Sequence, residues 1–215
     1  KSYGSIQVFN DFNLEITKNQ ITCILGASGV GKTTLLNILL GLVEVDSGQV
    51  LGLEGKKIVA VFQEDRLVES LSSIKNVQLA CNNKVTRTKL IDEFNKVGLG
   101  GFEDRPVSEL SGGMKRRVAI LRAVLSESDV IVMDEPFKGL DVELKSKIIE
   151  YVKDKTRNKT VIIVTHSLAE VKELDIPLEE DFYLEKKDLE SFISSFEIKN
   201  ENRMKEMPSI EFKEI

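Results

Sequence analysis

The stretch GASGVGKTT, residues 26–34, decides the fold of this chain. It fits the pattern G-x-x-x-x-G-K-[ST], in which small residues let consecutive backbone N–H groups point into one phosphate-accepting concavity. Lys32 is then expected to reach the β- and γ-phosphates of a nucleotide, and the Thr33 hydroxyl to ligate Mg²⁺. The residues predicted to bind phosphate are Gly26, Ala27, Ser28, Gly29, Val30, Gly31, Lys32, Thr33 and Thr34.

The flanks of the loop are those that such a motif requires. QITCIL, residues 20–25, predicts a short buried strand, and KTTLLNILLGL, residues 32–42, predicts a helix that begins at the loop. This order puts a phosphate at a helix N-terminus, where backbone N–H groups favour an anion. A glycine-rich turn with a purely structural role is the alternative, and the Lys-Thr pair between these two flanks argues against it.

Length and composition bound the remaining possibilities. The 215 residues suit one large domain or a domain with a small appendage, and 41% hydrophobic content is enough for a core. The net charge of −5 argues against a general nucleic-acid-binding surface, so KRR, residues 115–117, is predicted to be a solvated helix face. No apolar run is long enough to span a membrane.

The two cysteines, Cys23 and Cys81, are far apart in the sequence and have no metal-ligand spacing. Cys23 falls in the strand before the loop, so we expect it to be a small core residue. Cysteine usage of this kind is typical of a reducing, cytoplasmic compartment.

Predicted strands and helices alternate along the chain. Helices are predicted at 73–81, 87–97, 110–126 and 142–156, and buried strands at 129–136 and 160–167. This alternation predicts an α/β core with a mostly parallel sheet.

Three other segments have weaker patterns. VFNDFNLEI, residues 8–16, alternates apolar and polar residues and predicts an antiparallel strand, and 46–63 predicts two short strands joined by Gly-rich turns. Residues 191–215 are charged and weakly periodic, and we interpret them as a tail or a small edge element.

The segment DVIVMDEP, residues 129–136, ends an apolar strand in two carboxylates. Open α/β sheets bind ligands at this end of their parallel strands. Asp134 is predicted to bind the Mg²⁺ that Thr33 also ligates, which leaves Glu135 to accept a proton from an attacking water. The alternative is two acids that begin a solvated loop.

His166 and Gln63 also follow predicted strands. His166 is the only histidine in the chain and comes directly after VIIVT, so we expect it on the same edge of the sheet, bonded to the γ-phosphate and orienting the water and Glu135. A lone histidine is more often a structural residue, and its position here favours function. Gln63 ends IVAVF, and its amide is a weaker candidate for contact with Mg²⁺ or the water.

LSGGM, residues 110–114, is a second candidate anion-binding feature. Ser111, Gly112 and Gly113 precede a predicted helix, and in isolation a serine there is simply an N-cap. Because one site already has a complete phosphate loop, a second anion-binding helix end suggests that another subunit closes the site.

Together these features resemble the ATP-binding-cassette ATPases over about residues 1–175. The motifs occur in the family's order, and they are Tyr3, GASGVGKT, Gln63, LSGGM, VIVMDEP, GLD at 139–141 and His166. The resemblance implies a P-loop NTPase core with a small N-terminal antiparallel β-subdomain and an inserted α-helical subdomain at about 67–125. One such domain would occupy residues 1–190.

The same resemblance implies cofactors and partners. They are ATP, Mg²⁺ and a second copy in a head-to-tail dimer, with each nucleotide between one phosphate loop and the other subunit's Ser111, Gly112 and Gly113. Tyr3 would stack on adenine, and Asp141 would reach the opposite loop. No nucleic acid is expected.

Within the family, DEPF, LSGGM and VFQEDRL look like the nitrate/sulfonate/taurine-type importers. That likeness implies integral membrane permease subunits, an extracytoplasmic solute-binding protein, and a cytoplasmic location on the inner face of the membrane. Leu67, Val68 and Leu71 would line the groove for the membrane partner, although helix packing explains them nearly as well. The chain departs from the pattern at Met114 and at Lys138, where a small residue is usual before GLD.

Three other functions are possible on sequence grounds. A soluble ATPase of DNA repair would carry a long coiled coil between the phosphate loop and LSGGM. No heptad run lies between Thr33 and Ser111. A tandem translation-type factor needs two cassettes. A sensor that does not hydrolyse ATP is disfavoured by Glu135 and His166. The sequence leaves import against export open.

Overall fold

The computed structural model describes residues 1–82, 84–176 and 182–183 of the chain. Its centre is a five-stranded sheet with the order β4-β5-β6-β3-β7, in which every neighbouring pair is parallel. The strands are β3 (Ile21–Leu25), β4 (Ile58–Val61), β5 (Val130–Asp134), β6 (Thr160–Thr165) and β7 (Phe182–Tyr183). The predicted α/β core with a parallel sheet is confirmed.

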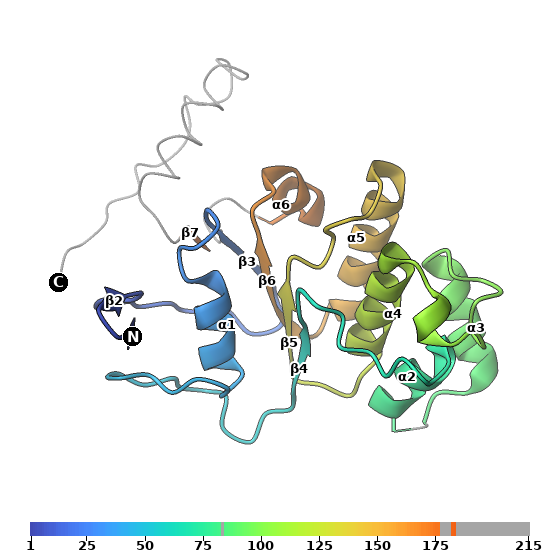
Figure 1. Ribbon diagram of the computed structural model, residues 1–215, viewed down its shortest axis with the longest axis horizontal. Helices are drawn as coiled ribbons and strands as arrows, with labels where there is room; N and C mark the ends of the chain where they lie inside the picture. Colours follow the sequence, from blue (N-terminus) through green and yellow to red (C-terminus); the bar gives the residue numbers. More distant parts are fainter. Residues whose placement is uncertain (83, 177–181, 184–215) are drawn as a thin grey trace, which may run out of the picture.

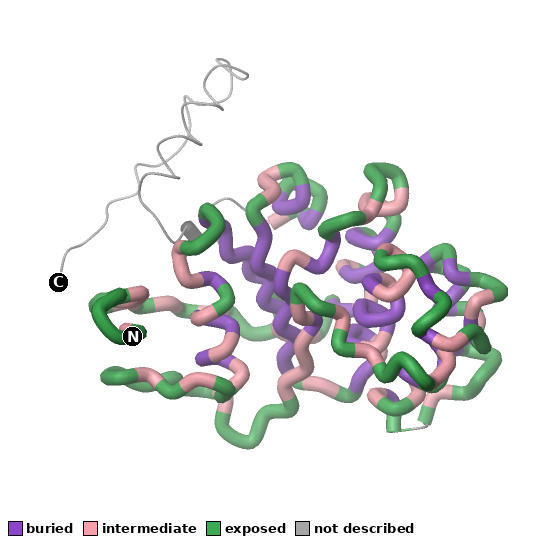
Figure 2. The backbone as a smooth tube through the Cα atoms, viewed as in Figure 1, coloured by how far each residue is buried: buried purple, intermediate pink, exposed green. Residues whose placement is uncertain are grey.

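Both faces of this sheet are covered, as the long apolar runs require. Along β5, Ile131 and Met133 pack into one core cluster, whereas Val130 and Val132 pack into the other. Successive side chains of a strand point to opposite faces, so the alternation shows that two layers cover the sheet. Figure 2 shows the buried residues concentrated on these strands and on the helices that face them.

Helices form the two covering layers. They are α1 (Lys32–Leu39), α2 (Ser73–Ala80), α3 (Arg87–Lys96), α4 (Gly112–Val124), α5 (Val142–Thr156) and α6 (Leu168–Leu174), with a 3₁₀ turn at Val107–Glu109. α1 covers one face, and α4 and α5 cover the other (Figure 1). The helices α2, α3, α4 and α5 each begin at a side-chain cap. In α3, for example, the Thr86 side chain accepts from the backbone N–H of Lys89.

The helices α2, α3 and α4 form a group beside the sheet. One buried carboxylate, that of Glu93 in α3, links this group to α5. Glu93 is only 2% exposed and accepts from Tyr151 Oη at 2.6 Å, from Lys155 Nζ at 2.7 Å and from Lys96 Nζ at 2.9 Å. Burial alone would raise the pKa of Glu93, but these three donors lower it below its usual value. The carboxylate is therefore charged and needs its donors.

We expect Tyr151→Phe to lower the free energy of unfolding by about 1.5–3 kcal/mol, because a hydrogen bond to a buried charge is lost. Urea unfolding measures this change. The control is Lys147→Met on the same helix, which removes an exposed ion pair with Glu143 and should change stability by less than about 1 kcal/mol. Equal changes in the two variants would contradict the role given to Glu93.

The N-terminal region differs from the sequence prediction. A small antiparallel sheet is present, but it pairs β1 (Ser2–Tyr3) with β2 (Ile6–Gln7), and residues 8–16 form no strand. The apolar residues Phe9, Phe12, Leu14 and Ile16 instead pack against the core cluster that includes α1. The alternation of apolar and polar residues in 8–16 reflects burial of one side of the segment, and the segment does not pair with a strand.

The prediction of two strands within 46–63 is half right. Only β4 forms, and residues 46–57 make successive turns in which Gly48 and Gly52 have φ of 86° and 82°. Turns at this spacing leave too few extended residues for a ladder. Cys23 is fully buried in the core, as predicted. The proposed tail, 191–215, lies outside the described residues.

Within the part of the chain that the structure describes, no helix is long and apolar enough to cross a membrane.

Candidate functional site

The predicted phosphate loop joins β3 to α1, and its geometry requires glycine. Gly31 precedes α1 with φ of 104°, and a Cβ there would lie 2.5 Å from Val8 Cγ1 and 3.0 Å from Phe9 Cζ. No side chain fits a left-handed position that is packed so closely. With glycine at the N-cap, the first backbone N–H groups of α1 meet no capping side chain from that residue, and they can serve an anion.

Lys32 closes the loop on itself. Its residue is only 8% exposed, and its ammonium group donates to the carbonyl oxygens of Gly26 and of Ala27, the latter at 2.7 Å. The positive charge is thus held at the concave side of the loop, where a phosphate would compete with these carbonyl oxygens for it.

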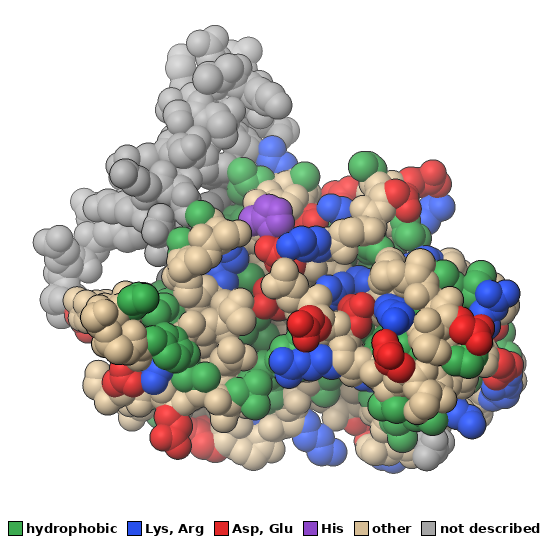
Figure 3. Space-filling view, viewed as in Figure 1, with side chains coloured by type: hydrophobic (Ala, Val, Ile, Leu, Met, Phe, Trp, Pro, Cys, Tyr) green, Lys and Arg blue, Asp and Glu red, His purple; other side chains and the backbone are tan. Residues whose placement is uncertain are grey.

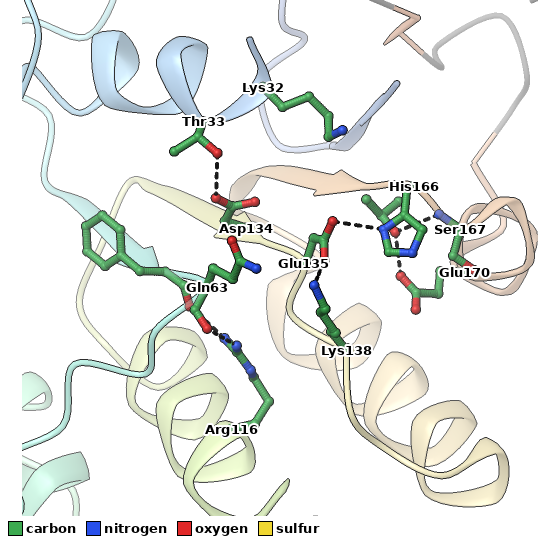
Figure 4. A network of polar contacts seen from close by, with 12 residues as sticks. Lys32, Thr33, Gln63, Arg116, Asp134, Glu135, Lys138, His166, Ser167 and Glu170 are labelled. Atoms are coloured by element: carbon green, nitrogen blue, oxygen red, sulfur yellow. Dashed lines mark hydrogen bonds and ion pairs between the residues drawn. The ribbon is translucent and has the colours of Figure 1, made fainter. Parts of the chain in front are cut away.

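Thr33 and Asp134, the two strongest predicted ligands of Mg²⁺, lie together. Thr33 Oγ1 donates to Asp134 Oδ2 at 3.3 Å, although the two residues come from α1 and from the end of β5 (Figure 4). Burial, and more weakly the charge of Glu135, raises the pKa of Asp134. A hydroxyl and a carboxylate oxygen are the donor types that Mg²⁺ prefers, so the pair fits this ion.

Glu135 follows Asp134 at a sharp turn of the backbone. Its φ is 45°, and its backbone N–H donates to the carbonyl of Val164 at 2.8 Å. Its carboxylate lies between two cationic or polar partners: Oε1 is 2.8 Å from His166 Nδ1, and Oε2 is 3.0 Å from Lys138 Nζ. Burial alone would raise the pKa of Glu135, but Lys138 and His166 lower it. The carboxylate is therefore ionised, as a general base must be.

His166 is held in place by residues that sequence patterns did not single out. Thr165 Oγ1 donates to Glu170 Oε2 at 2.6 Å and accepts from the backbone N–H of Ser167 at 3.0 Å. Glu170 is 4% exposed, and Lys145 Nζ contacts its other oxygen at 2.8 Å. This network fixes the backbone on both sides of His166. The single histidine, purple in Figure 3, reaches the molecular surface beside acidic and basic side chains.

Gln63 follows β4, and Arg116 of α4 holds its backbone. Arg116 donates to the carbonyls of Phe62, at 2.6 Å, and of Gln63, and its Nε is 3.2 Å from Asp65 Oδ1. The Gln63 side chain points toward Asp134 in Figure 4. The prediction that 115–117 is a solvated face is wrong for Arg116, which is 6% exposed, because its charge is satisfied by backbone carbonyls.

Ser111 and Asp141 each lie at the N-terminus of a helix. The Ser111 side chain caps α4 by accepting from the backbone N–H of Met114 at 3.3 Å, and Asp141 caps α5 by accepting from Leu144 at 3.0 Å. In the described residues, neither side chain bonds to the phosphate loop or to Glu135. The two segments are neighbours, because a methyl group at Gly113 would lie 3.7 Å from the Gly139 carbonyl.

Tyr3 lies on β1, and its residue is 47% exposed. The Lys1 Nζ atom is 5.3 Å from the ring centroid.

The structure brings the loop, Asp134, Glu135, His166 and Gln63 to the carboxyl ends of the parallel strands. Tyr3, Ser111 and Asp141 stand apart from them.

Comparisons with known proteins agree on one family. A profile described as "ABC transporter" matches residues 9–138. The taurine import ATP-binding protein TauB of Roseobacter denitrificans is 37% identical over 179 residues, which cover 77% of this chain and 66% of TauB. The chain thus spans about two thirds of the length of that relative. The lantibiotic transport ATP-binding protein SrtF of Streptococcus pyogenes is 33% identical over 186 residues, covering 81% of this chain and 80% of SrtF.

Solved structures give the same result. The dimeric structure of MJ0796, a bacterial ABC transporter cassette, has a TM-score of 0.68 and 29% identity, covering 77% of this chain and 83% of that one. A dimeric post-hydrolysis state of the same cassette bound to ADP and Pi has a TM-score of 0.66 and 28% identity, with the same coverage.

Proposed function

This chain belongs to the ABC transporter family, and from that premise we propose that it is an ATP-hydrolysing, nucleotide-binding transporter subunit. Hydrolysis would drive uptake of a small solute through separate membrane subunits. The importer names of several relatives support this direction of transport. The chain would sit on the cytoplasmic face of the membrane, bound to integral permease subunits that receive solute from an extracytoplasmic binding protein.

The observation that carries this proposal is the convergence of the phosphate loop, Asp134 and the Glu135–His166 pair at one edge of the sheet. The Glu135 carboxylate is 2.8 Å from His166 Nδ1, and Thr33 contacts Asp134 at 3.3 Å. Few reactions other than phosphoryl transfer to water need a phosphate-binding loop, a cation ligand and an ionised base together.

Each residue has a role in this mechanism. Lys32 exchanges its loop carbonyls for phosphate oxygens, and Thr33 and Asp134 would hold Mg²⁺. The ion, when bound, offsets negative charge on the phosphates. Glu135 accepts the proton of the attacking water, and His166 orients Glu135 and donates to the γ-phosphate. The Gln63 amide assists at the ion or the water.

A second copy of the chain would complete the site. Ser111, Gly112 and Gly113 would contact the nucleotide bound by the opposite subunit, and Asp141 would reach its loop. Exposure of Ser111 at the start of α4, with glycines behind it, supports this role. The MJ0796 cassette is dimeric, which supports the same arrangement.

The test combines two measurements. The purified chain should release phosphate from ATP only when Mg²⁺ is present, and it should co-purify with permease subunits when these are expressed together. Absence of phosphate release over a range of protein concentrations would contradict the proposed ATPase activity. Release without any membrane partner, together with binding to DNA, would favour the soluble repair-type alternative.

Tyr3 provides a separate test of the nucleotide site. If its exposed ring stacks on adenine, Tyr3→Ala should weaken ATP binding by about 1–3 kcal/mol, the range of base–aromatic stacking. Tyr3→Phe keeps the ring and is the matched control, so its affinity should match that of the wild type. Calorimetric titration with ATP measures both variants. An equal loss in the two would point to the hydroxyl and contradict stacking.

A further inference from the structure

Lys138 makes a contact that the proposed mechanism does not use. It lies in the turn after β5, and its Nζ is 3.0 Å from Glu135 Oε2. That oxygen is buried and has no hydrogen bond, so Lys138 is the group that satisfies its charge. The other oxygen already contacts His166. Both oxygens of the base are therefore engaged.

The direction of this contact is informative. In Figure 4, Lys138 approaches Glu135 from the side of α5, whereas Lys32 and Thr33 lie on the opposite side. An ammonium group there draws the carboxylate away from the loop that would hold the phosphates. It also occupies an oxygen that could accept a proton.

We propose that Lys138 is a positioning residue that restrains Glu135, competing with the attacking water for its carboxylate. The proposal rests on the proposed function, because it assigns a brake to the base of that reaction. Where a small side chain is usual before GLD, this chain thereby carries a cation that slows ATP hydrolysis.

We expect the restraint to slow hydrolysis without preventing it. The Lys138 side chain is 54% exposed, so water screens the pair from that side and limits its contribution, although the Glu135 side chain is only 12% exposed.

The fold does not depend on this side chain. In the described residues, the Lys138 side chain makes no ion pair or hydrogen bond other than its contact with Glu135. The Glu135 backbone is held separately by Val164, and its Oε1 by His166. Replacement of Lys138 should therefore leave unfolding unchanged, so a change in rate would report on the base.

The experiment compares steady-state phosphate release by three variants with the wild type. Lys138→Met keeps the length of the side chain and removes the charge, and it should raise kcat about two- to fivefold, the rate equivalent of one exposed ion pair, without changing KM for ATP. Lys138→Arg keeps the charge and should behave as wild type. Lys147→Met removes a 3.0 Å ion pair on the exposed side of α5 and should change nothing.

The outcomes separate the two claims. If wild type hydrolyses ATP and Lys138→Met, with an unchanged unfolding midpoint, is no faster or is slower, the restraint is overturned and the ATPase stands. An equal rise in Lys138→Arg would also overturn it, because the charge would then not be the cause. If neither wild type nor Lys138→Met releases phosphate, the proposed function fails, and the restraint fails with it.

Discussion

Glu135→Gln should bind ATP with wild-type affinity and release phosphate about 10²–10⁴-fold more slowly, the usual contribution of a general base. The amide keeps the shape of the side chain and its contact with His166, but it cannot accept the proton of the attacking water. Asp134 and Thr33, which lie 3.3 Å apart, are unchanged and should still hold Mg²⁺. Phosphate release and ATP titration measure the two effects separately.

The same variant should accumulate as a dimer, because ATP stays intact between the two subunits. Size-exclusion chromatography with ATP and Mg²⁺ tests this. Adding Ser111→Arg to Glu135→Gln should return the protein to a monomer, since a large cation replaces the small exposed cap at the contact with the opposite nucleotide. A monomeric Glu135→Gln protein with wild-type turnover would leave the mechanism without support.

Lys32→Ala should abolish hydrolysis and weaken ATP binding at least about tenfold, since a hydrogen bond to a charged group contributes about 1.5–3 kcal/mol. The lost charge is the one that offsets the β- and γ-phosphates. Calorimetric titration measures affinity, and phosphate release measures turnover.

Folding must be checked for this variant, because Lys32 also holds the carbonyls of Gly26 and Ala27. The unfolding midpoint without nucleotide shows whether the loop needs those contacts. Lys147→Ala, at an exposed position on α5, is the control for removing a lysine. Wild-type affinity and turnover in Lys32→Ala would refute the phosphate-loop assignment.

Much of the core could be predicted because its signals are local. The cap at Ser111, the helix periodicity of 142–156 and the apolar run of β5 lie within one segment each, and α4, α5 and β5 form where the sequence predicts. Parallel strands of such a sheet end at one edge, so Asp134, Glu135 and His166 could be expected together before any distance was known.

The errors concern features that depend on distant partners. Residues 8–16 have the alternation of a strand, but pairing requires a neighbouring strand, and α1 covers their apolar side instead. Glu170 lies in α6, shortly after His166 in the sequence, yet its role comes from Thr165 and Lys145, which other elements supply. In the sequence Arg116 looks like an ordinary cation on a helix surface. Its role depends on the carbonyls of residues 62–63, to which it donates hydrogen bonds. No pattern within one segment contains this information.

The helix α4 joins two parts of the site that the chain otherwise keeps separate. It begins beside Ser111, and two of its arginines hold the segment after β4: Arg116 at residues 62–65 and Arg122 at the carbonyls of Asp65 and Arg66. Thirteen residues of α-helix make a rod about 20 Å long that resists bending. A push on the Ser111 end therefore cannot be absorbed within the helix. A displacement at the Ser111 end is therefore expected to shift the Gln63 backbone, so the surface proposed to face a second subunit and the amide near Asp134 would move together.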